Sequence, residues 1–116
     1  MQTRVINDKI TLEELRLMAQ ESFGDFVKGA CDTEKRILAL GGELHSDCFD
    51  ALVENSSEAK DIWGFNLFPD FPAEKRIDFV SLINIRPSQN NRSMEIQNQE
   101  IREKISEIIN NLILWN

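Results

Sequence analysis

Residues 36–40, RILAL, form the stretch around which we expect a sheet to be built, and Gly41 and Gly42 follow it directly. Successive side chains of a strand point to opposite faces, so a strand of this composition is buried on both sides. Residues 26–32 alternate in polarity just upstream and predict a second strand, with a polar turn at residues 32–35 between the two. The two segments therefore predict a hairpin that places residues 36–40 in the interior of the sheet.

Two segments further along the chain also predict strands. Residues 61–68 alternate, with Trp63, Phe65 and Leu67 on one face. Residues 69–72 contain two prolines, which a sheet ladder does not accommodate together, so they form a connection. Residues 76–86 give the clearest strand pattern of the chain. The apolar side chains on one face of this fourth strand are Ile77, Phe79, Ile83 and Ile85.

The sequence also predicts a helix near each end of the chain. Thr11 and Glu14 have the spacing of a capping box, which predicts a helix from that point to about residue 23. Asn98 is a good cap for a second helix, whose apolar stripe is Ile101, Ile105, Ile108, Ile109 and Leu112. Between these, Ser46 or Asp47 could cap a short helix through about Val53, although residues 48–53 also fit an extended segment.

These elements predict one α+β domain over residues 1–116. The expected order is helix, strand, strand, short helix, strand, strand, helix. Short links between the strands favour antiparallel pairing, so we expect an antiparallel sheet of about four strands with the terminal helices packed on it.

Composition excludes several classes of protein. The chain has 13 Lys and Arg against 20 Asp and Glu, a net charge of −7, which repels phosphate backbones and argues against general nucleic-acid binding. No basic region followed by an apolar run opens the sequence, and the apolar runs are too short to span a bilayer, so we expect neither export nor membrane insertion. We therefore expect a cytoplasmic protein whose two cysteines are thiols.

The candidate ligand-binding residues lie where the fourth predicted strand ends. In a regular strand Asn84 and Arg86 project from the same face, and Asn90 and Arg92 follow in a polar loop. Asn66 joins them if the register places it opposite. A guanidinium beside carboxamides suits a carboxylate or phosphate, because its planar fork donates two parallel hydrogen bonds. This pattern predicts a site for a small anionic ligand or an acidic protein partner.

A structural role for the same residues is the competing interpretation. Arg86 would then pair with Asp78 or Asp61, and the amides of residues 88–91 would satisfy the backbone of an irregular loop. The sequence alone leaves both interpretations open.

His45 is the single histidine, and its neighbours allow two chemistries. It could act as a general base or contribute to a metal site, but His and Cys sites for metals need three or four ligands. Cys48 lies three residues away, which would bring the two together on a helix, yet no oxyanion-hole motif accompanies them. We therefore expect no metal and no cofactor, and the sequence identifies no catalytic residue.

The closing residues, 112–115, are apolar on more than one helical side. Two interpretations fit. The end folds back on the sheet, or it forms a homodimer interface or docking helix.

Several segments together resemble a known family. They are LEEL at 12–15, GGELH at 41–45, DIWGFNLFP at 61–69, INIRPSQ at 83–89, NRS at 91–93 and IREKI at 101–105. The chain is similar to a family of short bacterial proteins known only as a domain of unknown function. The resemblance covers nearly the whole chain and implies a bacterial, cytoplasmic, self-contained domain, but it implies no activity, ligand or catalytic residue.

We expect a non-catalytic binding or interaction module that uses the polar stretch after the fourth strand. The alternative is a small hydrolase or toxin-like nuclease, in which Arg86 and Arg92 stabilise developing negative charge and His45 or a carboxylate moves protons. The acidic net charge and the single histidine favour the binding module.

Overall fold

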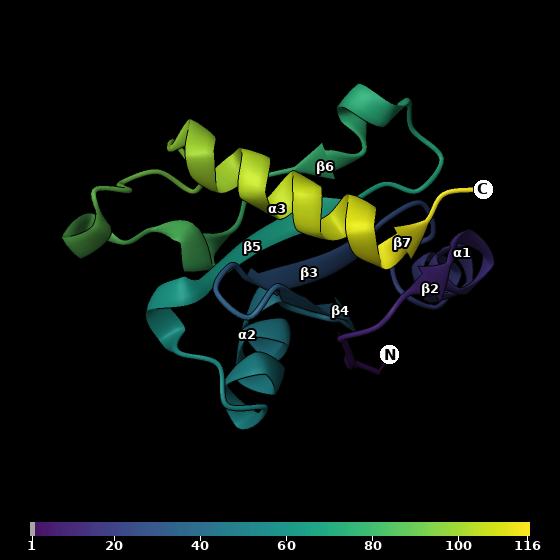
Figure 1. Ribbon diagram of the computed structural model, residues 1–116, viewed down its shortest axis with the longest axis horizontal. Helices are drawn as coiled ribbons and strands as arrows, with labels where there is room; N and C mark the ends of the chain where they lie inside the picture. The colour runs from purple at the N-terminus through teal and green to yellow at the C-terminus, as the bar shows by residue number, and fades with distance from the viewer. Residues whose placement is uncertain (1) are drawn as a thin grey trace.

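The computed structural model describes residues 2–116 and contains a five-stranded antiparallel sheet (Figure 1). The order across the sheet is β1-β4-β3-β5-β6, so β4, which contains residues 37–40 of the RILAL segment, lies in the interior as predicted. The strands are β1 (Arg4–Ile6), β3 (Val27–Asp32), β4 (Ile37–Gly42), β5 (Ile62–Leu67) and β6 (Ile77–Asp78).

Three α-helices of the described residues accompany the sheet and confirm the α+β class: α1 (Leu12–Glu21), α2 (His45–Glu54) and α3 (Gln99–Leu112). Thr11 forms the predicted capping box with Glu14, and the Asn98 side chain accepts the amide hydrogens of Glu100 and Ile101. The segment that fitted either a short helix or an extended chain, residues 48–53, is part of helix α2, which begins earlier than predicted. Its N-cap is Leu44, whose backbone amide donates to the Asp47 carboxylate at 2.9 Å.

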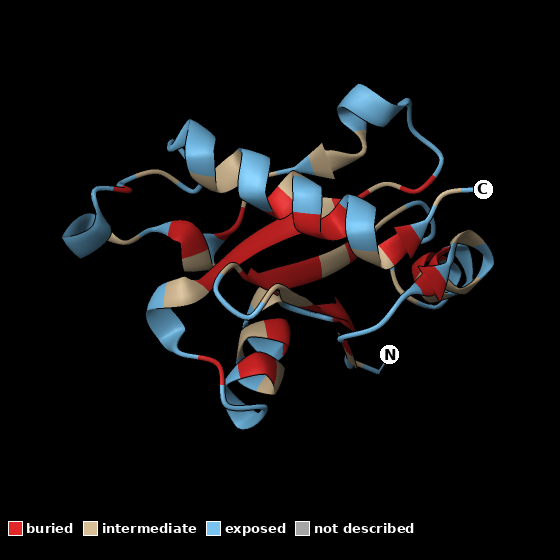
Figure 2. Ribbon diagram, in the orientation of Figure 1, coloured by how far each residue is buried: buried red, intermediate tan, exposed pale blue. Residues whose placement is uncertain are grey.

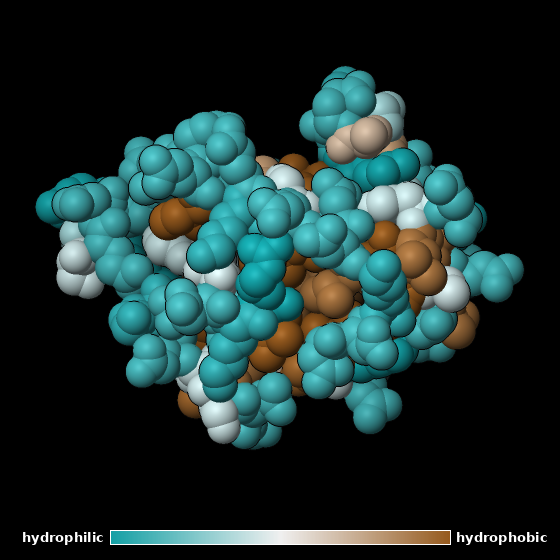
Figure 3. All heavy atoms as spheres, in the orientation of Figure 1, coloured by the Kyte–Doolittle hydropathy of each residue, from teal (hydrophilic) through white to brown (hydrophobic). Residues whose placement is uncertain are grey.

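The main core lies between one face of the sheet and helices α3 and α1. In Figure 1, α3 crosses this face of the strands, and Figure 2 shows the buried residues along β3, β5 and the inner side of α3. The strands contribute Val27, Cys31, Leu38, Leu40, Phe65 and Leu67, and the helices contribute Leu15, Ile105, Ile108 and Ile109. Seen from the α3 side, the surface is mostly hydrophilic, with hydrophobic residues showing mainly along the seam beside the helix (Figure 3).

The other face of the sheet is covered by α2. Ala30, Ala39 and Ile62 of the strands pack against Cys48 and Leu52 of the helix in a second, smaller cluster. Gly42 allows this approach, since a side chain there would lie 2.9 Å from the Leu44 carbonyl oxygen. The beginning of α2 is therefore held directly against the end of β4.

The predicted fourth strand over residues 76–86 is wrong beyond its first few residues. Only residues 77–78 belong to the sheet, and Val80 makes an isolated bridge with Glu95. Residues 82–84 and 87–89 are single 3₁₀ turns. The expected shared face is also absent, because Ile77 and Phe79 pack on the main core whereas Ile83 packs on the α2 side.

A side chain takes the place of that strand. The Asn84 carboxamide accepts from the Gly64 amide at 2.8 Å and donates to the Gly64 carbonyl at 3.0 Å, as the backbone of a neighbouring strand would do. Ser81 begins the turn by accepting the Ile83 amide on its hydroxyl, at 3.3 Å. Gly64 leaves room for this packing, since a side chain there would lie 2.8 Å from the Ser81 Cβ.

The two ends of the chain meet in a small parallel pair that the sequence did not predict. Ile10 of β2 (Ile10–Thr11) pairs with Ile113 of β7 (Ile113–Leu114). The Trp115 indole donates to the Asn110 side chain, and the Arg76 guanidinium lies 4.1 Å from the centre of its ring. The C-terminal end thus folds back on the domain, and dimerisation through it stays a prediction.

Within residues 2–116, no helix has the length and apolar character needed to cross a membrane.

Candidate functional site

Asn84, the first predicted ligand-binding residue, is fully buried. Besides its two bonds to Gly64, its amide nitrogen donates to the carbonyl oxygens of Met94 at 3.2 Å and Phe79 at 3.4 Å. Every polar atom of the side chain is therefore bonded to backbone. Asn84 ties β5 to the irregular segment that follows β6.

Arg86 is likewise directed at backbone. Its guanidinium donates to the carbonyl oxygens of Ile83, Ala59 and Ile62, and it lies 4.5 Å from the centre of the Trp63 ring. Burial lowers the pKa of this guanidinium, which nevertheless stays protonated at neutral pH. Its ion pairs with Asp78 or Asp61, the alternative considered above, do not occur among the contacts of the described residues.

The remaining three predicted residues do not meet Arg86 at one cleft. Asn90 has a left-handed backbone conformation, φ 61°, which closes the 3₁₀ turn at residues 87–89. Arg92 is exposed and makes no ion pair with any residue of the described chain. Asn66 lies near the opposite end of β5 from the Arg86 contacts. Ligand binding by this set of five residues stays a prediction, and Arg92 is its most accessible cation.

Asn91 is a structural residue that the sequence reasoning grouped only with its loop. It is buried, and its amide nitrogen donates to the carbonyl oxygens of Asn84 at 2.7 Å, Ser93 at 2.9 Å and Glu95 at 3.1 Å. Its side-chain oxygen accepts from the Gln97 amide at 2.9 Å. Together with Asn84 it fixes the path of the chain between β6 and α3.

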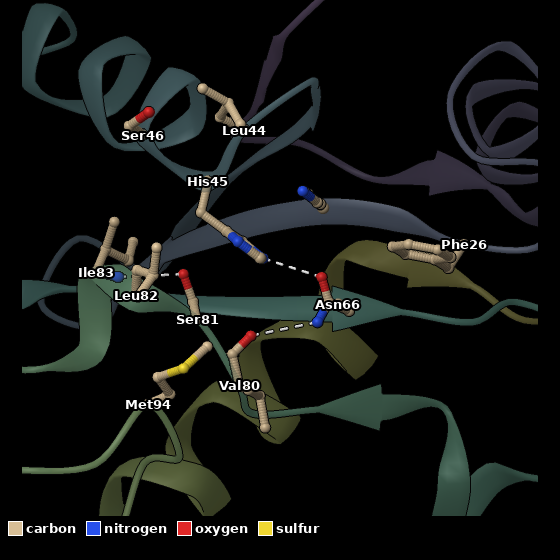
Figure 4. A pocket seen from close by; sticks show the side chains of 11 residues that line it. Phe26, Leu44, His45, Ser46, Asn66, Val80, Ser81, Leu82, Ile83 and Met94 are labelled. Atoms are coloured by element: carbon tan, nitrogen blue, oxygen red, sulfur yellow. Dashed lines mark hydrogen bonds between the residues drawn. The ribbon is translucent and has the colours of Figure 1, made fainter.

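A hollow of about 460 Å³ lies on the α2 side of the sheet, between the first turn of α2 and residues 80–83 (Figure 4). We call it the α2 pocket. Its floor is formed by β3 and β5, which contribute Lys28 and Asn66. The apolar residues that line it are Phe26, Leu44, Val80, Leu82, Ile83 and Met94, and the other polar ones are His45, Ser46 and Ser81. Apolar atoms form most of its surface and polar side chains interrupt it, as is usual for ligand pockets.

A row of three polar residues crosses the sheet at this pocket. Lys28 pairs with Asn66 in the β3–β5 register, and Asn66 pairs with Asp78 in the β5–β6 register, so all three share the α2 face. The Asn66 amide nitrogen donates to Asp78 at 3.0 Å and to the Val80 carbonyl at 3.2 Å. These two acceptors fix the orientation of the carboxamide, whose oxygen must face the other way.

His45 meets that oxygen. Its Nε2 lies 2.9 Å from the Asn66 Oδ1 and 2.9 Å from the Phe65 carbonyl oxygen. Two acceptors at one nitrogen require a hydrogen there, so Nε2 is protonated and Nδ1 of the neutral ring is an acceptor. Burial lowers the pKa of His45, with the two hydrogen bonds opposing the effect and Lys28 adding to it. The ring is therefore neutral at neutral pH.

Comparison of the sequence with models of protein families gave a match. A family model described as a protein of unknown function, DUF5674, matches residues 4–112. The chain belongs to the DUF5674 family. Neither the curated proteins nor the solved structures gave a match. Membership of DUF5674 confirms the resemblance found in the sequence, and it assigns no ligand or reaction to the α2 pocket.

The two thiols of this DUF5674 protein are buried, and neither is hydrogen-bonded to His45. Cys48 donates to the Lys28 carbonyl oxygen at 3.6 Å, and burial raises the pKa of its thiol to about 11. Burial raises the pKa of Cys31 as well. Both are therefore protonated at neutral pH, which is unsuited to a nucleophile. In the described part of the chain, no three His, Cys, Asp or Glu side chains are grouped as a metal site would need.

The lowered pKa of His45 predicts a specific pH dependence. Because the folded state binds this proton less readily than the unfolded chain does, stability should be complete above pH 6.5 and fall as the pH drops from there towards the folded-state pKa. The measurement is the free energy of urea unfolding at neutral and mildly acid pH, for the wild type and His45→Gln. The variant should lose less stability on acidification than the wild type does. Because both proteins have the same carboxyl groups, the difference between them reports the contribution of His45.

The single histidine makes a direct check available. An NMR titration of its ring protons should have its midpoint below 6.5, and a midpoint above that value would contradict the geometry of His45 described here.

Proposed function

We propose that the protein is a non-catalytic binding module, and that its ligand is a small molecule held in the α2 pocket. The observation that supports this most strongly is the combination of an apolar hollow with a floor of fixed polar groups. Pockets for small ligands have volumes of about 300 to 1,000 Å³, a range that includes this one. A cytoplasmic location belongs to the same proposal and is supported by the two free thiols.

The pocket is organised before any ligand arrives. Asn66 is held by Asp78 and Val80, His45 is held by Asn66 and Phe65, and the first turn of α2 is packed against Gly42. Polar groups fixed in advance lose little freedom on binding, so more of the interaction energy appears as affinity. Leu44, Leu82 and Met94 at the edge are 57%, 72% and 41% exposed, so a ligand would remove apolar surface from water on both sides of the opening.

The same geometry gives less support to the alternative, a hydrolase or toxin-like nuclease. Arg86 has its guanidinium bonded to carbonyl oxygens, so it is poorly placed to stabilise charge on a substrate. His45 has no nucleophile bonded to it, and both thiols are protonated. These contacts favour binding over catalysis.

Blocking the pocket tests the proposal. Ser46 is exposed on the first turn of α2 and lines the opening, so the indole of Ser46→Trp should fill it without disturbing a buried residue. The matched control is Glu54→Trp, which adds the same side chain at the exposed end of the helix. The ligands are three compounds with one octyl body: octanoate, 1-octanol and octylammonium.

The measurement is the change in backbone amide NMR signals on addition of each compound. We expect at least one compound to shift the signals of pocket residues such as Lys28, Asn66 and Ser81. Binding should disappear in Ser46→Trp and persist in Glu54→Trp. The proposal is overturned if all three compounds leave these signals unchanged up to their solubility limit, or if Ser46→Trp binds as the wild type does.

A further inference from the structure

We infer that the ligand of the α2 pocket is an amphipathic monoanion, an apolar body with one carboxylate, and that Lys28 binds its charged group. This inference rests on the proposed function and specifies the chemical class of its ligand. It also places the anion contact on β3, and not at Arg86 and Arg92 as the sequence pattern predicted.

Lys28 is a half-buried cation without an acidic partner. Its ammonium group lies 4.9 Å from the centre of the Phe23 ring, and no carboxylate of the described residues forms an ion pair with it. The chain has 20 acidic residues against 13 basic ones, so carboxylates are plentiful. Lys28 nevertheless has no carboxylate partner within residues 2–116, so the three N–H donors of its ammonium group can bind a ligand in the pocket.

Asp78 is the acid that shares the sheet row with Lys28, and Asn66 separates the two. Lys28 lies on β3 and Asp78 on β6, with β5 between them, so their backbones are about 9 to 10 Å apart at the usual spacing of strands. The Asp78 carboxylate accepts the Asn66 amide hydrogen. Asn66 thus provides Asp78 with a neutral partner and leaves the ammonium group of Lys28 unpaired.

The beginning of α2 also faces this hollow, and its first turn contains the Asp47 carboxylate, which offsets the positive end of the helix dipole. His45 and Ser46 are the first two residues of the helix, where backbone amides have no acceptor within the helix, and both residues line the pocket. Leu44 supplies no side-chain acceptor for them. The inference therefore depends on the cavity and on Lys28, and not on the end of the helix.

The remaining lining defines the other part of the ligand. Phe26, Leu82, Ile83 and Met94 offer only apolar surface, which binds a hydrocarbon or aromatic body and leaves further charges on the ligand without partners. The net charge of −7 disfavours polyanions at long range. One carboxylate on an apolar body therefore fits the pocket better than a nucleotide or a sugar phosphate.

The test compares octanoate, 1-octanol and octylammonium, measured by NMR titration on four proteins. These are the wild type, Lys28→Gln, Lys28→Arg and the control Lys104→Gln, which removes the same charge from an exposed position of α3 on the opposite side of the sheet. The wild type should bind octanoate about tenfold or more tightly than octanol, as a hydrogen bond to a charged group provides. Octylammonium should bind most weakly.

Lys28→Gln should lower the affinity for octanoate to that for octanol and leave the octanol affinity unchanged. Lys28→Arg should restore the preference for the acid, and Lys104→Gln should keep it. Thermal unfolding of each variant establishes that the comparison is made on folded protein.

The outcomes separate this inference from the function on which it rests. Equal binding of octanoate and octanol by the wild type overturns the assignment of the anion and leaves the pocket as a binding site. Persistence of the octanoate preference in Lys28→Gln overturns the role of Lys28 in the same way. If none of the three compounds binds, the proposed function fails and this inference fails with it.

Discussion

Asn84→Ala is expected to lower the free energy of unfolding by about 3 to 5 kcal/mol, because each buried polar group left without a partner costs about 1 to 3 kcal/mol. The substitution removes the acceptor of the Gly64 amide and the donor to the Gly64 carbonyl in the same step. It also removes one of the two donors to the Met94 carbonyl oxygen, which keeps the Ser81 backbone amide. Natural domains have only about 5 to 15 kcal/mol of stability in total, so the variant should be close to unfolding.

Urea unfolding followed by circular dichroism measures this loss. The matched control is Asn111→Ala, an exposed position on α3, where the change should be within about 0.5 kcal/mol. Since Asn84 substitutes for a strand beside β5, amide hydrogen exchange at Gly64 should also become faster in the variant. A loss of less than about 1 kcal/mol would show that Asn84 does not hold residues 80–94 against the sheet.

The elements predicted correctly are those whose signal is local. The stripe of isoleucines in α3 repeats over several turns, and the N-cap residues Thr11 and Asn98 indicate where α1 and α3 begin. The RILAL segment is apolar on both faces and lies in the interior of the sheet. In each case the neighbouring residues in the sequence contain the information that fixes the element.

The fourth strand was predicted wrongly because its end depends on a residue far away in the sequence. The alternation of residues 76–86 is real, but the Asn84 side chain pairs with Gly64 and displaces the backbone from the ladder. Only a glycine at position 64 allows residues 81–83 to pack so closely, and nothing near Asn84 indicates this. The short strands β1, β2 and β7 were missed for another reason, since two or three residues show no period.

The α2 pocket was not predicted from the sequence. Asn66 lines it, but the sequence placed Asn66 in a different site, beside Asn84 and Arg86, on the condition that the register allowed this. Lys28 was missed, although the alternation of residues 26–32 already put it on the face shared with Ala30. Lys28 is notable because Asn66 separates it from the acid in its row, Asp78. That row is set by the register of β3, β5 and β6, which only the folded sheet shows.

Arg86→Ala is expected to destabilise the protein by about 2 to 3 kcal/mol, because a hydrogen bond from a charged donor contributes about 1.5 to 3 kcal/mol and the exposed part of this network contributes less. The carbonyl oxygens of Ile62 and Ile83 lose the guanidinium donor, whereas that of Ala59 keeps the Ile62 amide. Trp63 also loses the guanidinium stacked on its ring. Arg86→Lys should recover little of this loss, since one ammonium group cannot reach carbonyls that a planar fork reaches together. Urea unfolding measures both variants.

Arg92→Ala is the matched control, and its exposed position predicts a change within about 0.5 kcal/mol. Binding of octanoate in the α2 pocket should be the same in folded Arg86→Ala as in the wild type, because Arg86 does not line that pocket. The opposite pattern, full stability with loss of an anionic ligand, would instead support the anion site predicted at residues 84–92. The two variants thus decide whether the guanidinium of Arg86 serves the fold or a ligand, which is the alternative that the sequence left open.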